Sequence, residues 1–402
     1  MSIRKLGLIA VLLLSASSCR KQKVDVPERG VPFTDSLYGT TIVRITDKDA
    51  DDYSGPGIQN EYARADAENA TGSHLILRGN DGEWYLYERT GCRLVKHFTD
   101  LGLNEEPEPR WSTSSEPMCF YYFHGTELRS YDVEADTSGL CHDFKAEFPA
   151  AWAITTKTEG DASLDRRYWC LMVEDSLYNV LAVACYDRES DSVIGRKTSF
   201  PDGINWVSMD MSGNECVIGY ESSPAQAFSR DFSTMTQLPA GATGHMDLAL
   251  DAQGNDVMVY QSNNTDSITM ADLATGAATP LVAIPFDVNT DIGLHFSGNC
   301  SDTPGWALVS TYGAENPPAG EAHSWMDNLL FMVELAPNSR IVKVCQTRCY
   351  TGTSPVSNYM AECFASVNRA GTRVVYGSNW GIYSPQDYTE AYWVALPAGR
   401  NQ

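Results

Sequence analysis

The chain has 402 residues, 43% of them hydrophobic, and its 52 acidic side chains outnumber 29 basic ones, which gives a formal net charge of −23. Such a surface repels phosphate backbones, so nucleic acids are excluded as expected partners and polyanionic ligands are disfavoured. The length exceeds that of one small domain and suits a large repeat fold. No run of about 20 apolar residues follows the N-terminal region, so no further membrane span is expected.

The N-terminal region predicts export and lipid attachment. Residues 1–19 have the pattern of a bacterial lipoprotein signal peptide, because two basic residues precede the short apolar stretch 6–14 and small residues precede Cys19. Lipidation of Cys19 would make the lipid the membrane anchor and place the protein in the cell envelope, as an outer-membrane lipoprotein facing the periplasm or the surface. An ordinary secretory signal is the alternative. The polar residues 20–38 predict a tether.

A pair of strands joined by a turn rich in Gly, Asp or Asn recurs along the rest of the chain. The copies lie at residues 74–91, 119–139, 170–195, 216–237 and 256–276. A period of about 40 to 50 residues built from hairpins is typical of a β-propeller. We therefore predict an all-β fold over residues 39–402, a seven-bladed β-propeller of four-stranded antiparallel sheets.

Turn signals set the bounds of the predicted blades in chain order. The blades cover residues 72–100, 107–145, 160–200, 203–238, 245–285, 293–346 and 358–397. The last blade has only two firm strand patterns, at 373–377 and 391–396. We expect the early strand 41–46 to join this blade and close the ring, which would hide two sheet edges.

Polar turns such as 251–255 stand between predicted strands. In this turn Gly254 supplies the positive φ that a tight turn needs, and Asp251 can accept hydrogen bonds from backbone amides. Calcium binding is the alternative interpretation. The twelve-residue spacing of a calcium loop is absent, so turn formation is favoured.

Two histidines begin neighbouring inner strands, where a propeller opens its central channel. His245 stands in Gly-His-Met-Asp, and His295 stands in Leu-His-Phe-Ser. Two imidazoles so placed can share a metal ion or act as a base and a ligand. Hydrogen bonding to loops is the alternative.

Several short runs resemble the oligogalacturonate lyases, a group of seven-bladed propellers, and their uncharacterised relatives. These runs are EPRW at 108–111, HMDLA at 245–249, HFSGN at 295–299, GWALVS at 305–310 and RVVYGSNW at 373–380. The resemblance implies a manganese ion held by histidines of neighbouring inner strands and by a glutamine. It also implies a further histidine that takes the proton during β-elimination of uronates.

Position by position, the resemblance implies that His295 is a metal ligand and His245 the base. The group's remaining ligands are two histidines in a His-x-His pattern with a glutamine just before. This chain has Glu362-Cys363-Phe364 in place of His-x-His, and Tyr359 near the glutamine position. Glu362 can bind a divalent metal, manganese or calcium, but Phe364 cannot. The chain therefore departs from the group in most of the implied metal shell.

Three further residues are candidate substrate-binding groups. Arg110 suits a carboxylate, and Trp111 and Trp380 suit the apolar faces of sugar rings. Packing between blades is the alternative for both tryptophans.

Ten cysteines follow Cys19. Those in predicted strands, such as Cys119 and Cys216, are expected to be buried free thiols. A disulfide that involves Cys345, Cys349 or Cys363 is also expected, but its pairing cannot be deduced from the sequence.

These observations lead to three functional hypotheses. The first is a lipid-anchored, monomeric propeller that binds an oligosaccharide or other small ligand at the channel mouth without catalysis. The second is a metal-assisted polysaccharide lyase of the oligogalacturonate type that acts by β-elimination. The third is a scaffold for protein partners.

Overall fold

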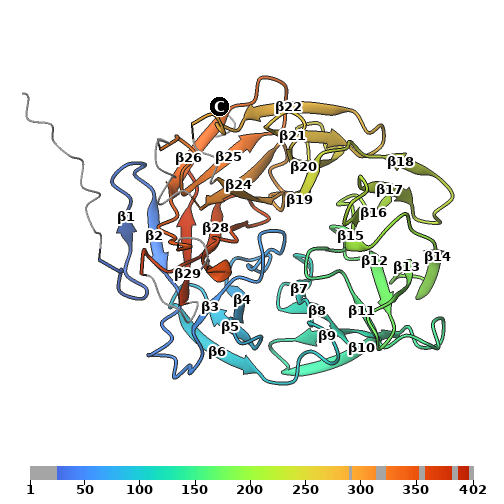
Figure 1. Ribbon diagram of the computed structural model, residues 1–402. Helices are drawn as coiled ribbons and strands as arrows, with labels where there is room; N and C mark the ends of the chain where they lie inside the picture. The colour runs from blue at the N-terminus through green and yellow to red at the C-terminus, as the bar shows by residue number, and fades with distance from the viewer. Residues whose placement is uncertain (1–24, 289–291, 314–322, 353–357, 383–387, 398–402) are drawn as a thin grey trace, which may run out of the picture.

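The computed structural model describes residues 25–288, 292–313, 323–352, 358–382 and 388–397, and these form a ring of antiparallel sheets (Figure 1). Five separate four-stranded sheets and one nine-stranded sheet make up the ring. The nine-stranded sheet holds two blades joined by a short parallel pairing of β29 with β3. The predicted seven-bladed propeller is thus confirmed. Cys19 and the rest of the predicted signal peptide lie outside the described residues.

Each blade consists of four antiparallel strands. They are arranged side by side, in order from the central axis to the rim. The strands, blade by blade, are as follows: blade 1, β3 (Gly57–Gln59), β4 (His74–Gly79), β5 (Trp84–Glu88) and β6 (Arg93–Phe98); blade 2, β7 (Arg110–Trp111), β8 (Cys119–His124), β9 (Glu127–Asp132) and β10 (Thr137–Asp143); blade 3, β11 (Ala153–Thr155), β12 (Tyr168–Glu174), β13 (Val180–Asp187) and β14 (Ser192–Lys197); blade 4, β15 (Ile204–Met209), β16 (Glu215–Tyr220), β17 (Gln226–Ser229) and β18 (Met235–Gln237); blade 5, β19 (Ala242–Leu250), β20 (Asp256–Ser262), β21 (Ser267–Asp272) and β22 (Ala278–Ala283); blade 6, β23 (Gly293–Ser297), β24 (Trp306–Tyr312), β25 (Leu329–Glu334) and β26 (Ile341–Gln346); blade 7, β27 (Ser366–Val367), β28 (Arg373–Ser378), β29 (Thr389–Ala395) and β2 (Thr41–Arg44).

Burial follows the position of a strand between axis and rim. The second strands pack against neighbouring blades on both faces, and five consecutive residues of β16, from Cys216 to Tyr220, are buried. The outermost strand β6 instead alternates exposed and half-buried residues until Phe98. An alternating pattern is what a strand with one solvated face requires. Apolar cores therefore lie between the blades.

The ring closes through the N-terminal part of the chain. Strand β2 pairs with β29 in antiparallel register, with Ile42 opposite Val394, and β1 (Phe33–Thr34) extends the same sheet. The predicted closure by residues 41–46 is confirmed. It explains why the last predicted blade showed too few strands, because its fourth strand comes from the other end of the chain.

Two inner strands lie before their predicted blades. Blade 1 begins at β3 rather than at residue 72, and blade 3 begins at β11 rather than at residue 160. Both strands are three residues long, too short to show a period of two. Their positions depend on pairing with β4 and β12, which a local pattern does not reveal.

The segment between β3 and β4 crosses the centre of the ring, and we name residues 60–68 the axial segment (Figure 1). The side chain of Ser366 donates to the carbonyl of Ala65 over 2.6 Å, and the indole of Trp111 donates to that of Ala67 over 3.0 Å. Asn299 donates to the carbonyl of Arg64 over 3.0 Å. Blades 2, 6 and 7 thus hold the segment on the axis.

Helical structure is nearly absent from the described residues, where a single 3₁₀ turn, η1 (Tyr359–Ala361), precedes the last inner strand. No helix in these ranges has the length and apolar character needed to cross a membrane.

Candidate functional site

The two histidines singled out in the sequence lie next to each other on the axis. His245 belongs to β19 and His295 to β23, and their ring centroids are 5.2 Å apart. Because inner strands of neighbouring blades run side by side, their first residues meet at the same end of the channel. The structure therefore brings together the pair that the sequence predicted.

Aromatic rings surround His295. Tyr312 stacks on the imidazole with centroids 4.9 Å apart, and Phe364 meets it edge-on at 4.9 Å. Tyr62, from the axial segment, places its hydroxyl 3.3 Å from Nδ1 of His295. These rings leave the imidazole 2% exposed. Its environment is buried and mostly aromatic.

Glu362 approaches the remaining edge of His295. It follows the turn η1, which places its Oε2 atom 3.5 Å from Nε2 of His295. Burial raises the pKa of Glu362 to about 7, although Tyr312 and His245 act in the opposite direction. Glu362 therefore titrates near neutral pH.

Burial has the opposite effect on the imidazoles. It lowers the pKa of His295 to about 3, and the nearby Arg64 adds to the shift. Burial also lowers the pKa of His245 to about 4, with further contributions from His295 and Arg64. Both rings are neutral at pH 7, and His245 is a weak base.

The residues around His295 do not fit a manganese ion. Among the described residues, no three His, Cys, Asp or Glu side chains converge closely enough to hold a metal. His295 and Glu362 offer one nitrogen and one carboxylate, and Phe364 and Tyr312 occupy the adjacent space. Mn²⁺ takes a larger set of oxygen and nitrogen ligands than this pair supplies.

Arg64 occupies the axis beside the histidines. Its guanidinium lies 4.8 Å from the centroid of Trp206 and donates to the carbonyl of Gly244 over 2.6 Å. The same group lies 2.9 Å from the carboxylate of Glu159, and burial raises the pKa of that acid. Blades 3, 4 and 5 therefore all contact one side chain of the axial segment.

Several buried polar atoms near the axis have no hydrogen-bond partner among the described residues. They are Oε1 of Glu61, Nη1 of Arg64, Nδ1 of His245 and Nε2 of His295. A buried polar group without a partner costs about 1 to 3 kcal/mol. Because these four atoms lie near one another, a polar molecule at the axis could form hydrogen bonds with them.

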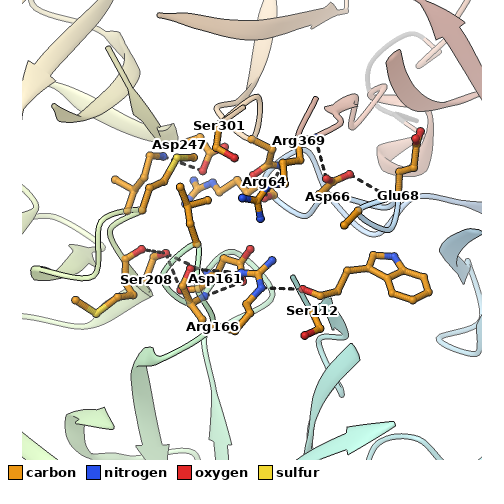
Figure 2. A pocket seen from close by; sticks show the side chains of 18 of the residues that line it. Arg64, Asp66, Glu68, Ser112, Asp161, Arg166, Ser208, Asp247, Ser301 and Arg369 are labelled. Atoms are coloured by element: carbon orange, nitrogen blue, oxygen red, sulfur yellow. Dashed lines mark hydrogen bonds and ion pairs between the residues drawn. The ribbon is translucent and has the colours of Figure 1, made fainter. Parts of the chain in front are cut away.

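A small cavity lined by both charged and apolar side chains adjoins Arg64 on the axis (Figure 2). Its volume is about 50 Å³, room for a few water molecules but not for a sugar ring. Arg166 pairs with Asp161 over 2.6 Å along its wall. Burial raises the pKa of Asp66 to about 8 and that of Asp247 to about 7. At neutral pH these acids are partly protonated, which reduces the negative charge at the cavity.

The three predicted substrate-binding residues are buried. Arg110 pairs with Glu61 over 2.6 Å and donates to the carbonyl of Gly160 over 2.9 Å, so its guanidinium is already engaged. Trp111 packs edge-on against Phe120 and lines the axial cavity. Arg110 and Trp111 are therefore next to the axis.

Trp380 lies elsewhere, at the seam where the ring closes. It stacks on Tyr392 with centroids 4.9 Å apart and meets Phe33 edge-on at 5.8 Å. Its indole donates to the carbonyl of Asp25. The structure shows packing around this ring, the alternative that the sequence left open.

The sequence did not single out Tyr62, Arg64 or Tyr312. Tyr62 and Arg64 precede the first predicted blade, in a stretch without periodicity, and Tyr312 ends the buried strand β24. No local pattern distinguishes these residues, because their role depends on the axial segment entering the ring.

Comparison with protein families and with characterised proteins finds no match to this chain. Solved structures do match. An oligogalacturonate lyase in complex with manganese aligns with a TM-score of 0.62 and 14% identity, over 92% of this chain and 96% of its own. The oligogalacturonate lyase of Vibrio parahaemolyticus aligns with a TM-score of 0.63 and 13% identity, over 92% of this chain and 97% of its own. A chain of a mitotic checkpoint complex aligns with a TM-score of 0.51 and 12% identity, over 99% of this chain and 100% of its own. The chain thus has the propeller fold of the oligogalacturonate lyases, and the resemblance predicted from the sequence is confirmed at the level of fold.

Proposed function

We propose that this protein is a lipid-anchored, extracytoplasmic propeller that binds a small polar ligand, an oligosaccharide, at the mouth of its channel without transforming it. One observation carries the proposal: buried donors and acceptors without hydrogen-bond partners lie together around Arg64, His245 and His295. Sugar hydroxyls donate and accept hydrogen bonds, so they suit a site that offers both.

The site is poorly equipped for β-elimination. A base must be able to take a proton near the working pH, and burial lowers the pKa of His245 to about 4. The uronate carboxylate needs a cation, and Arg110 is already paired with Glu61. The aromatic rings of Tyr312 and Phe364 lie where further metal ligands would be needed.

Glycan-array screening followed by calorimetry tests the proposal. We expect one class of oligosaccharide to bind the wild-type protein, and we expect Glu61→Gln and His245→Asn to weaken that binding at least tenfold. Arg340→Ala, at a surface ion pair with Glu334, is the matched control and should bind normally. Circular dichroism must show that all variants are folded. The absence of any carbohydrate ligand would contradict the proposal.

A lyase is the second candidate, favoured by the pairing of His245 with His295 on a fold shared with the oligogalacturonate lyases. Incubation with oligogalacturonate and manganese decides between the two. We expect no ultraviolet absorbance from an unsaturated product. An absorbance rise that disappears in His245→Asn would support the lyase.

A further inference from the structure

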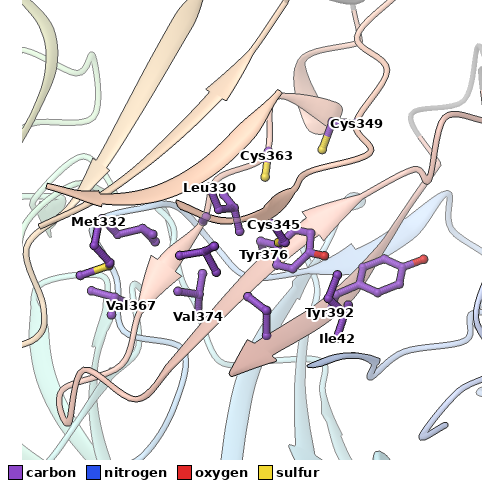
Figure 3. Close-up of a cluster of buried hydrophobic side chains, with 14 of the residues drawn as sticks. Ile42, Leu330, Met332, Cys345, Cys349, Cys363, Val367, Val374, Tyr376 and Tyr392 are labelled. Atoms are coloured by element: carbon purple, nitrogen blue, oxygen red, sulfur yellow. The ribbon is translucent and has the colours of Figure 1, made fainter. Parts of the chain in front are cut away.

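A buried turn carries one edge of the candidate site. The seam between blades 6 and 7 is filled by an apolar cluster that includes Cys363 (Figure 3). Cys363 is buried there with a free thiol, as are Cys345 and Cys349, so the disulfide expected from the sequence is not formed among these three. Cys363 has a φ of 57°, in the left-handed region that residues other than glycine rarely adopt. The chain therefore turns sharply at a residue that is held in the core.

The residues on either side of this cysteine are fixed in place. The side chain of Asn60 donates to the carbonyl of Phe364, and the amide of Glu362 donates to the carbonyl of Tyr359 over 3.1 Å. Glu362 and Phe364 both lie against His295 as a result. The carboxylate of Glu362 is thus positioned before any ligand binds.

Aromatic rings line the approach to Glu362. The ring of Phe364 has its centroid 5.0 Å from that of Tyr359 and 5.1 Å from that of Tyr62. Phe364 is buried, whereas Tyr359 is 54% exposed. Solvent also reaches Glu362, whose side chain is 18% exposed. A ligand that arrives from solvent therefore meets the ring of Tyr359 and the carboxylate of Glu362.

The arginines at this end of the channel already have partners, but Glu362 lacks a cationic one. Three arginines lie near the start of the axial segment. Their ion pairs are Arg64 with Glu159 at 2.9 Å, Arg78 with Glu106 at 2.6 Å and Arg110 with Glu61 at 2.6 Å. Within the described ranges, neither a lysine nor an arginine pairs with Glu362, which has the neutral imidazole of His295 at 3.5 Å.

These features suit a cationic ligand better than an anionic one. A protonated amine donates hydrogen bonds and accepts none, so it complements a carboxylate. The face of an aromatic ring attracts a cation, and Tyr359 supplies such a face beside the acid. Nε2 of the buried His295, which has no hydrogen-bond partner among the described residues, adds a second polar atom next to Oε2 of Glu362. A carboxylate ligand would instead meet Glu362 as a like charge.

We propose that the oligosaccharide bound at this end of the channel carries a free amino group, as an oligomer of glucosamine does. The ammonium group pairs with Glu362 beside His295, and the sugar ring lies along the exposed face of Tyr359. The inference rests on the proposed function, because it names the class of sugar for the same site. The net charge of −23 favours the same class of ligand, since an acidic protein attracts cations.

Calorimetry at pH 7 with three oligosaccharides of equal length tests the inference. The probes are an oligomer of glucosamine, the same oligomer with every amine acetylated, and an oligomer of galacturonate. Acetylation removes the charge and keeps the sugar rings. We expect the glucosamine oligomer to bind at least about tenfold more tightly than the acetylated one, because hydrogen bonds between charged groups are about twice as strong as neutral ones. We expect the galacturonate oligomer to bind most weakly.

Two substitutions locate the amine. Glu362→Gln keeps the shape of the side chain but cannot ionise, so it should bring the affinities of the glucosamine oligomer and its acetylated form within about twofold of each other. Glu334→Gln, at a surface ion pair with Arg340, is the control and should keep the preference. Tyr359→Leu should weaken binding of the glucosamine oligomer by about two- to fivefold. Tyr178→Leu, at a tyrosine that is 57% exposed on another blade, should not.

The outcomes separate this inference from the proposed function. If the acetylated or the galacturonate oligomer binds as tightly as the glucosamine oligomer, the protein binds sugars but does not select the amine, and only the inference is wrong. The same holds if Glu362→Gln keeps the preference. If none of the three oligomers binds and glycan screening finds no other sugar, the proposed function fails and the inference fails with it.

Discussion

Nε2 of His295 lies 3.5 Å from Oε2 of Glu362, yet the two side chains are not an ion pair at neutral pH. Burial keeps the imidazole neutral because its pKa falls to about 3, and burial raises the pKa of the acid to about 7. Below pH 7 both groups are mostly neutral. Above it, a carboxylate faces an uncharged ring.

This relationship predicts that stability falls with rising pH. The folded-state pKa of Glu362, about 7, exceeds its ordinary value of 4.5, so the folded state binds the proton more tightly. The resulting stabilisation is fully present below pH 4.5 and is lost as pH rises through 7. Glu362→Gln cannot ionise, so at pH 8 it should be more stable than wild type, by about 3 kcal/mol at most.

Urea unfolding of both proteins at pH 5.5 and pH 8 measures this difference. Glu334→Gln, at a surface ion pair with Arg340, is the control and should not reproduce the gain at pH 8. If the free energy of unfolding changed by the same amount between the two pH values in wild type and in Glu362→Gln, Glu362 would not be the group responsible.

Arg64 should be among the most important side chains for stability. Its removal leaves the carboxylate of Glu159 without its partner and deprives Trp206 of its cation contact. Breaking a buried pair from one side costs about 3 to 5 kcal/mol, so we expect Arg64→Met to lose stability in this range. The matched variant Arg340→Met breaks an exposed pair and should lose less than about 1 kcal/mol. If chemical denaturation gave similar losses of stability for Arg64→Met and Arg340→Met, Arg64 would not be a central contact.

Closure of the ring gives a third prediction. Ile42 is fully buried in β2, so Ile42→Ala should lower the free energy of unfolding by about 2 to 5 kcal/mol. It should also increase aggregation, since loss of β2 exposes the edge of β29. Leu37, 73% exposed and five residues earlier, is the control, and Leu37→Ala should change stability by less than about 0.5 kcal/mol. Thermal unfolding with light scattering measures both effects.

The repeated hairpins and the closing strand were predictable because each rests on local alternation and turn chemistry. Asp251 illustrates this, because its carboxylate accepts hydrogen bonds from the backbone amides of Gln253 and Asn255. In the same turn Gly254 has a φ of 83°. The meeting of His245 and His295 was also predictable, since repeat geometry brings inner strands together.

The axial segment was not predictable in this way. Tyr62 and Arg64 belong to a stretch without periodicity, and their contacts come from blades 3 to 6. Likewise, the sequence could not show that Glu61 forms a buried ion pair with Arg110. Such contacts depend on how the whole ring encloses one loop, which no window of the sequence records.

Phe364 gives the last prediction, because it lies beside His295 with ring centroids 4.9 Å apart. Phe364→His would add a nitrogen ligand to the nitrogen of His295 and the carboxylate of Glu362, bringing the donors to the three that metal sites commonly use. We expect manganese to raise the melting temperature of Phe364→His but not that of wild type, since a ligand that binds only the folded state at 100 times its Kd adds about 2.7 kcal/mol. Phe364→Leu removes the same ring without adding a ligand and should not respond. A manganese response in wild type or in Phe364→Leu would show that the existing residues already hold the metal and that the loss of ligands inferred here is wrong.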